Sequence, residues 1–193
     1  AMGPAEELFR RDADAEVRDA AFRLLEALGR PAEEAMVGAL DDAGYRLRAV
    51  RALGAMKSAK GAARMAQLYE GEARREVKSE IFACLRALGD EPFLLRRLRD
   101  PDAEVRLEAL EALRASKSAE VLDEAGRLFA EEAESRLVER AYALLTAAGA
   151  KAAPHLLRGL KSRRPQTRIR AIEGLRDGGH EGALEAIGGA LLK

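Results

Sequence analysis

A thirteen-residue pattern returns six times along this chain, and its spacing constrains the fold more than any other feature of the sequence. Successive copies begin 28, 32, 28, 32 and 30 residues apart. A fixed period in this range is typical of one small helical unit stacked on further copies of itself. The copies are VRDAAFRLLEALG from Val17, YRLRAVRALGAMK from Tyr45, VKSEIFACLRALG from Val77, VRLEALEALRASK from Val105, LVERAYALLTAAG from Leu137 and TRIRAIEGLRDGG from Thr167.

Each copy carries an apolar stripe at helical spacing. If the first residue of a copy is position zero, position four is alanine or isoleucine, position eight is always leucine, and position eleven is mostly apolar. Positions zero, four, seven, eight and eleven fall on one side of a helix at about 100° per residue. We therefore predict that these positions form the core, and that the small residues at position four let a second helix approach closely.

Position twelve predicts where each of these helices ends. Two copies carry a lysine there, Lys57 and Lys117, and a serine that can cap the next helix follows each lysine. The other four copies carry glycine, which accepts the left-handed backbone of a helix end. These glycines are Gly29, Gly89, Gly149 and Gly179.

Shorter apolar segments with helical spacing lie between the copies. Each unit is therefore predicted to be a hairpin, in which a variable first helix precedes the repeated "signature" helix, and stacking buries the stripe that a single hairpin leaves exposed. Some residues also return sixty positions later, such as KSA from Lys57 and again from Lys117, which indicates a duplicated two-hairpin unit with long and short first helices in alternation. The segments cover residues 31–40, 59–69, 92–98, 119–129, 154–160 and 182–192.

These patterns predict an all-α fold, namely a right-handed α-solenoid of about six helical hairpins plus a terminal helix. We expect a single domain over residues 4–193, because this length suffices for one continuous core. Residues 1–3 resemble the remnant of a cleaved tag. The segment 182–192 either caps the stack or continues into a longer protein or complex.

Position one of the signature is basic in five copies, and acidic residues precede it in most of them. The clearest example is DPDAEVR, from Asp100 to Arg106. This combination resembles the HEAT-repeat family, in particular its short bacterial form, which includes the phycobilisome-lyase HEAT-like proteins. The resemblance covers nearly the whole chain and implies a helical scaffold. Acid–arginine pairs are expected to tie neighbouring hairpins together, with an interruption at Val138, and a row of arginines that binds phosphate is the alternative.

Several classes of function are disfavoured by the composition. The chain has 33 basic and 33 acidic side chains and a net charge of zero, which argues against a dedicated nucleic-acid binder. The only cysteine, Cys84, falls on the predicted stripe and is interpreted as a small core residue. His155 and His180 lack partners at metal or catalytic spacing and are expected to be solvated. We therefore predict that the chain is not an enzyme and uses no catalytic residue, metal or cofactor.

The location of the protein is predicted from what the sequence lacks. No run of about eighteen apolar residues is present, so no membrane span is expected. No signal peptide is visible either. We expect a cytoplasmic protein.

Two sets of residues are candidates for contact with a partner. Position two faces away from the predicted stripe but is apolar at Leu47, Leu107 and Ile169, which suggests a binding seam on the concave face, with burial against neighbouring hairpins as the alternative. The expected charged rim consists of Arg51, Arg86, Arg114 and Arg176. A basic patch without acids is interpreted as ordinary solvated surface, or else as a steering patch for an acidic partner or nucleic-acid phosphates. It consists of Arg158, Lys161, Arg163, Arg164, Arg168 and Arg170.

The predicted function is a non-catalytic protein–protein interaction scaffold that presents a concave helical surface to a protein or peptide. One alternative is a nucleic-acid-associated protein similar to the HEAT-like DNA glycosylases. Such a protein is expected to show a basic face with exposed aromatic residues, and this chain has no tryptophan. A chromophore-lyase subunit is the other alternative and rests on the resemblance alone.

Overall fold

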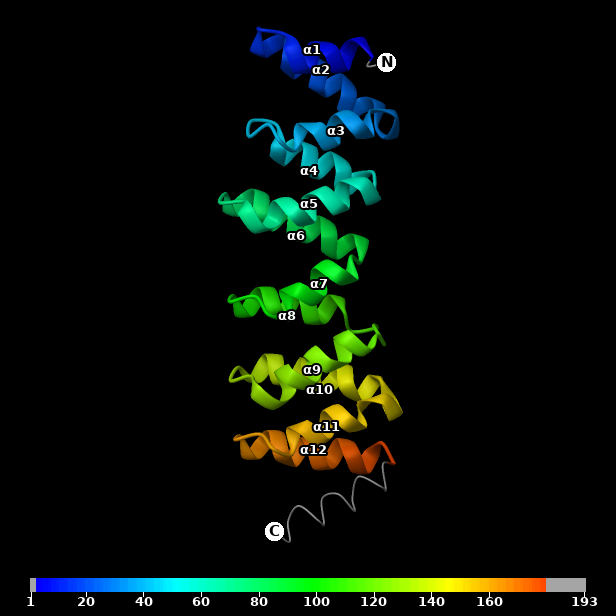
Figure 1. Ribbon diagram of the computed structural model, residues 1–193, viewed down its shortest axis with the longest axis vertical. Coiled ribbons are helices and arrows are strands. Elements are labelled where there is room, and N and C mark those ends of the chain that lie inside the picture. The colour runs from blue at the N-terminus through cyan, green and yellow to red at the C-terminus, as the bar shows by residue number, and fades with distance from the viewer. Residues whose placement is uncertain (1–2, 180–193) are drawn as a thin grey trace. The chain divides into compact units, whose positions relative to one another are not determined.

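The computed structural model describes residues 3–179, which form helices and turns without a strand. Figure 1 shows these helices, coloured from the N-terminus to the C-terminus. The chain divides into two compact units, residues 1–90 and 91–193, which we call unit 1 and unit 2. The predicted all-α class is confirmed. None of the helices in residues 3–179 is long and apolar enough to cross a membrane.

Unit 1 contains three helical hairpins. In each of them a first helix packs against the signature helix that follows it. The predicted first helices are present, and a helix at Pro4–Arg11 supplies the first helix of the first hairpin. The elements are α1 (Pro4–Arg11), α2 (Ala15–Leu28), the 3-10 turn η1 (Arg30–Ala32), α3 (Glu33–Ala39), α4 (Arg46–Ala55), α5 (Ala59–Gly71) and α6 (Arg75–Leu88).

Unit 2 contains three further hairpins within its described residues. The terminal helix predicted over residues 182–192 lies outside the described residues. The elements are α7 (Glu91–Arg97), α8 (Ala103–Ala112), α9 (Ala119–Glu131), α10 (Ser135–Ala147), the 3-10 turn η2 (Gly149–Ala152), α11 (Ala153–Gly159) and α12 (Pro165–Asp177).

Neighbouring hairpins stack in the same way inside each unit. First helices pack on first helices, as α3 does on α5 and α9 does on α11. Signature helices pack on signature helices, as α4 does on α6 and α8 does on α10. Stacked hairpins of this kind are the arrangement of an α-solenoid. The right-handed superhelix and the single domain over residues 4–193 stay predictions.

From α3 onward, first helices alternate in length, as the sixty-residue repetition predicts; α1, with 8 residues, is short like α3. The helices α5 and α9 each have 13 residues, whereas α3, α7 and α11 each have 7 residues. Ser58 and Ser118 cap the two long helices, because their hydroxyl groups accept hydrogen bonds from the backbone N–H groups of Gly61 and Val121. Both predicted serine caps are therefore confirmed.

The core is centred on positions four and eight of the signature helices. Every leucine at position eight is buried, as is every residue at position four. Position five is also buried in four copies, at Phe22, Val50, Phe82 and Leu110. Position seven was predicted to be core and is buried at Leu144 and Gly174. In α2, however, Leu24 at position seven is 52% exposed and Leu28 at position eleven is 50% exposed. The buried side of α2 is therefore rotated by about 60° from the predicted stripe, toward position five.

Five of the six signature helices end one or two residues before position twelve, as predicted, whereas α8 ends earlier, at Ala112. All four glycines there have a positive φ, between 61° and 68°. Lys57 has a φ of 51° and thus adopts the same left-handed backbone, although it carries a side chain. Lys117 shows no positive φ.

Arginines at position one of the signature pair with acids of the neighbouring hairpin at two places among the described residues. Arg46 Nη1 donates to Glu72 Oε2 over 2.9 Å, from α4 to the turn that follows α5. Sixty residues later, Arg106 Nη2 donates to Glu132 Oε2 over 3.0 Å, from α8 to the turn that follows α9. Val138 occupies position one of the signature in α10 and is buried, so it contributes no such pair.

Candidate protein-interaction surfaces

Apolar side chains recur on the C-terminal halves of α2, α4 and α6, all of which belong to unit 1. They stand at positions seven, ten and eleven of these helices, together with Ala83 at position six of α6. Leu24 and Leu28 are the two most exposed of the large ones. We call this set the unit 1 apolar surface, and it consists of Leu24, Ala27, Leu28, Ala52, Ala55, Met56, Ala83, Cys84, Ala87 and Leu88.

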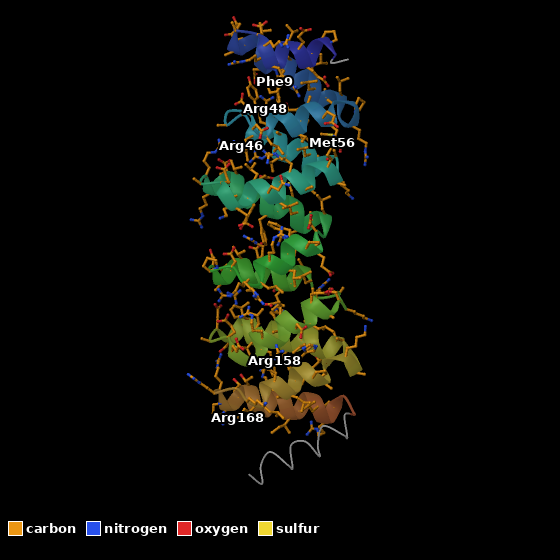
Figure 2. The ribbon with its side chains drawn as sticks, viewed as in Figure 1. Phe9, Arg46, Arg48, Met56, Arg158 and Arg168 are labelled. Carbon is orange, nitrogen blue, oxygen red and sulfur yellow. The ribbon has the colours of Figure 1, made fainter. Side chains whose placement is uncertain are left out.

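Two clefts lie on this surface. One has a volume of about 380 Å³ and is lined by residues of α2 and α4, including Ala52, Ala55 and Met56. Figure 2 shows Met56 at the end of α4 that leads into α5. The second cleft has a volume of about 220 Å³ and is lined by residues of α4 and α6, including Cys84 and Leu88. Small side chains form much of both linings, so a partner can approach the helices closely.

Charged side chains at the edge of the first cleft are already paired with each other. Arg48 bonds to Asp19 and Glu26 of α2 and also lies over the ring of Phe22, with 4.6 Å between the guanidinium carbon and the ring centroid. Arg51, which was predicted as a rim residue, lines the same cleft and lies 3.1 Å from Glu80. The basic and acidic side chains at the edge of the first cleft therefore neutralise each other.

Cys84 was interpreted as a core residue, but its side chain is only half-buried and lines the second cleft. Its Sγ atom donates to the carbonyl oxygen of Val50 over 3.7 Å. Burial raises the pKa of the Cys84 thiol, and the carboxylate of Glu80 raises it further. The thiol therefore stays protonated at neutral pH, which is the opposite of an activated nucleophile.

The three residues of the predicted position-two seam have different environments. Leu107 is 5% exposed, Leu47 is half-buried and Ile169 is 46% exposed. Leu107 is buried because position two of α8 lies toward the next signature helix, α10, on which α8 packs. The seam is thus not a uniformly exposed apolar surface. For Leu107 the alternative, burial against a neighbouring hairpin, holds.

The remaining predicted rim arginines are all exposed. Arg86 lies on α6 of unit 1, whereas Arg114 and Arg176 belong to unit 2. Arg176 forms an ion pair with its neighbour Asp177 over 2.8 Å. The structure therefore brings only Arg51 of the four to the unit 1 clefts, and the role of these arginines in binding stays a proposal.

Half of the predicted basic patch is taken up by contacts inside the protein. Arg164 donates to the carbonyl oxygens of Glu132 and Ala133 over 2.8 and 2.6 Å. Arg168, labelled in Figure 2, donates to the carbonyl oxygen of Ser162 over 2.9 Å, and Arg170 is paired with Glu139. These three arginines stabilise the stack. The other three, Arg158, Lys161 and Arg163, line a cleft of about 400 Å³ at the turn that precedes α12.

His155 was expected to be solvated, and this expectation is wrong. Its side chain is 11% exposed, because α11 packs on α9 where Gly126 leaves room for the imidazole ring. The Nδ1 atom lies 3.5 Å from Asp123 Oδ1 without a hydrogen bond. Burial lowers the pKa of His155, although Asp123 opposes this shift. His180 lies outside the described residues, within which no group of three or more His, Cys, Asp or Glu side chains is arranged to hold a metal ion.

Sequence reasoning missed the apolar surface because it assigned positions seven and eleven to the core. One signal could have revealed it. Position ten lies outside the predicted stripe, yet it is alanine in five of the six copies, and all five alanines are exposed. A small apolar residue that recurs at a solvated position indicates a surface where another backbone can approach.

The chain shares partial similarity with one protein family and with solved structures. An engineered protein solved as a Northeast Structural Genomics Consortium target is 19% identical, with 92% of this chain and 98% of that chain covered and a TM-score of 0.45. A designed armadillo repeat protein in complex with the peptide (KR)4 is 17% identical, with 90% of this chain and 99% of that chain covered and a TM-score of 0.48. A second designed armadillo repeat protein is 17% identical, with 89% of this chain and 97% of that chain covered and a TM-score of 0.46. No curated protein matches the chain. The family model described as HEAT repeat matches residues 92–115, so the hairpin formed by α7 and α8 is similar to a HEAT repeat.

Proposed function

We propose that this protein is a non-catalytic binding scaffold, and that its unit 1 apolar surface holds a helical segment of a protein partner. Two observations carry this proposal: the exposed pair Leu24 and Leu28, one turn apart on α2, and two clefts lined largely by small apolar side chains of α4 and α6. Exposed large apolar side chains and apolar clefts are more typical of a binding surface than of ordinary solvated surface.

A helical partner fits the form of this surface. An amphipathic helix binds a groove through apolar side chains at intervals of three and four residues. The two clefts can accept such side chains, while Ala52, Ala55 and Ala87 leave room for the backbone of the partner. The paired charges of Arg48 and Arg51 require no compensating charge from the partner.

Aromatic residues do not favour the nucleic-acid alternative. All eight Phe and Tyr side chains lie within the described residues, and none of them is exposed. Stacking of bases on aromatic rings, which single-strand and base-flipping proteins use, is therefore not offered by this part of the chain. No described residue supports a chromophore-lyase role.

Two finer assignments belong to this proposal. The DPDAEVR motif from Asp100 supports the short bacterial form of the HEAT family, with its phycobilisome-lyase-like members. A reducing compartment such as the cytoplasm suits a chain whose one cysteine has no intramolecular partner for a disulfide.

The experiment compares the double variant Leu24→Asp/Leu28→Asp with wild type. Partners captured by the wild type from a lysate of the source cells are identified by mass spectrometry, and the affinity of each purified partner is then measured by calorimetry. We expect the double variant to bind at least about tenfold more weakly, because two central apolar contacts are lost. Its melting temperature should change little, since both leucines are half exposed.

Leu8→Asp is the matched control. Leu8 is 44% exposed on α1, outside the apolar surface, so this variant should bind as the wild type does. Equal affinity of the double variant and the wild type for the partner would show that the partner does not bind at the unit 1 apolar surface. Equal weakening by Leu8→Asp would show a general loss of folding or solubility instead.

A further inference from the structure

The turn before the last described signature helix has lost its acids. In the fourth hairpin this turn carries Asp100 and Asp102, and Asp102 caps α8 by accepting a hydrogen bond from the backbone N–H of Glu104 over 2.9 Å. In the sixth hairpin the corresponding turn, residues 160–164, carries Ser162 and Arg164 instead. Three of its five residues are basic.

This replacement is unfavourable for the helix. The N-cap residue of α12 is Arg164, no side chain caps the helix, and no acidic residue lies in its first turn. A cation close to a helix N-terminus is disfavoured by the helix dipole, and the absence of a capping side chain removes a stabilising hydrogen bond from the first turn. Folding alone therefore does not explain a basic turn at this place.

Two cations of the turn have no partner among the described residues. Lys161 and Arg163 are exposed, and neither forms an ion pair or side-chain hydrogen bond with any residue from 3 to 179. Arg158, on α11, reaches only Asp123, over 3.9 Å to the carboxylate and 3.4 Å to the carbonyl oxygen. Figure 2 shows Arg158 on this helix.

These three cations line one preformed cleft of about 400 Å³. Its floor is held in place by contacts to the preceding hairpin. The hydroxyl of Ser162 donates to the carbonyl oxygen of Ala130 over 2.6 Å, and Arg164 donates to the carbonyl oxygen of Ala133. A bound anion would therefore meet the cations without reordering of the turn, which favours binding.

We propose that this cleft binds an acidic segment of a protein, whose carboxylates pair with Lys161, Arg163 and Arg158. The segment must be a peptide with separated acids rather than a continuous polyanion, because the carboxylate of Glu131 also lines the cleft and repels an unbroken row of phosphates. No aromatic residue lines the cleft, so it offers no stacking to nucleic-acid bases. The site lies in unit 2, apart from the unit 1 apolar surface, and the two proposals can fail separately.

The test measures fluorescence anisotropy of a labelled peptide of alternating glutamate and serine, with its glutamine–serine counterpart as a neutral probe. We expect the wild type to bind the glutamate peptide, to ignore the neutral probe, and to lose affinity as salt is raised. The variant Lys161→Glu/Arg163→Glu should bind about tenfold more weakly or worse, because two attractive pairs become repulsive.

Lys117→Glu/Lys151→Glu is the matched control. Both lysines are exposed, belong to unit 2, lack a partner among the described residues, and change the net charge by the same amount. This control should bind the peptide as the wild type does. The apolar-surface variant Leu24→Asp/Leu28→Asp should also keep its affinity for the peptide, which separates this site from the proposed function.

Four outcomes overturn the proposal. The first is no binding of the glutamate peptide, and the second is an equal loss of peptide affinity in the two charge variants. The third is displacement of the peptide by inorganic phosphate at similar concentration, and the fourth is binding of short duplex DNA that is tighter than that of the peptide and is lost in the Lys161→Glu/Arg163→Glu variant. The third outcome assigns a small-anion site, and the fourth assigns nucleic acid.

Discussion

Arg46 and Glu72 join two neighbouring hairpins through a contact of 2.9 Å between Nη1 and Oε2. The Glu72 side chain is 3% exposed, and it also accepts a hydrogen bond from the backbone N–H of Arg74 over 2.9 Å. Arg106 and Glu132 repeat this relationship sixty residues later in unit 2. The duplicated unit is thus visible in the ion pairs as well as in the lengths of the helices.

Acid sensitivity should follow from Glu72. Burial by itself raises the pKa of this carboxyl, but hydrogen bonds from Arg74 and Arg46 outweigh burial and lower the pKa to about 2. A group with a depressed pKa stabilises the fold above its unfolded pKa of about 4.3 and loses that contribution as pH falls toward 2. A shift of this size corresponds to an upper value of roughly 3 kcal/mol.

We therefore expect Glu72→Gln to lower the urea midpoint at pH 7 and to flatten its decline between about pH 5 and pH 2. Glu173→Gln, an exposed change on α12, should leave the decline unaltered. If Glu72→Gln keeps the pH dependence of the wild type, Glu72 does not carry the acid sensitivity.

Lys57 should be replaceable by glycine with a gain in stability. Its φ of 51° places a side chain in the left-handed region, where a non-glycine residue is disfavoured by about 1 kcal/mol. Lys57→Gly should raise the free energy of unfolding by up to about 1 kcal/mol in chemical denaturation. Lys117 occupies the same repeat position without a positive φ, so Lys117→Gly should give no gain in stability. A gain of the same size at both positions would contradict the assigned backbone.

Gly159 should tolerate no side chain. A methyl group at this position would overlap the ring of Phe129, where α11 crosses α9. Gly159→Ala should therefore lower the free energy of unfolding by about 1–3 kcal/mol. Gly71→Ala, at the end of α5 with no atom within 4 Å of an added Cβ, should be neutral or slightly stabilising. Thermal melts of the two variants give the comparison. The reverse order of the two variants would contradict the α9–α11 contact.

Position two of the signature provides a matched pair of variants in unit 2. Leu107 is 5% exposed, so Leu107→Asp buries a charge and should destabilise the protein by roughly 2–4 kcal/mol. Ile169 is 46% exposed, so Ile169→Asp should change stability by less than about 1 kcal/mol. Denaturant unfolding of both variants gives the comparison. If Leu107→Asp were as stable as the wild type, Leu107 would be exposed rather than buried.

Local features of this protein could be predicted from its sequence. The helices, their glycine ends and the serine caps at Ser58 and Ser118 depend on contacts between residues a few positions apart, and the repetition displays each of them several times. The leucine of position eight is buried in every copy, because it is the residue common to all the stripes.

The surface was decided only by tertiary packing. Whether Leu28 or Leu107 faces solvent depends on the direction from which the neighbouring helices approach a signature helix, and a rotation of about 60° exchanges the two sides. The basic patch shows the same limit. Arg164 and Lys161 are equally basic in the sequence, but only the structure shows that Arg164 is held by the carbonyl oxygens of Glu132 and Ala133 while Lys161 faces an open cleft. Periodicity determines which residues share a face of a helix, and the packing of one hairpin on the next determines which of those faces remains exposed.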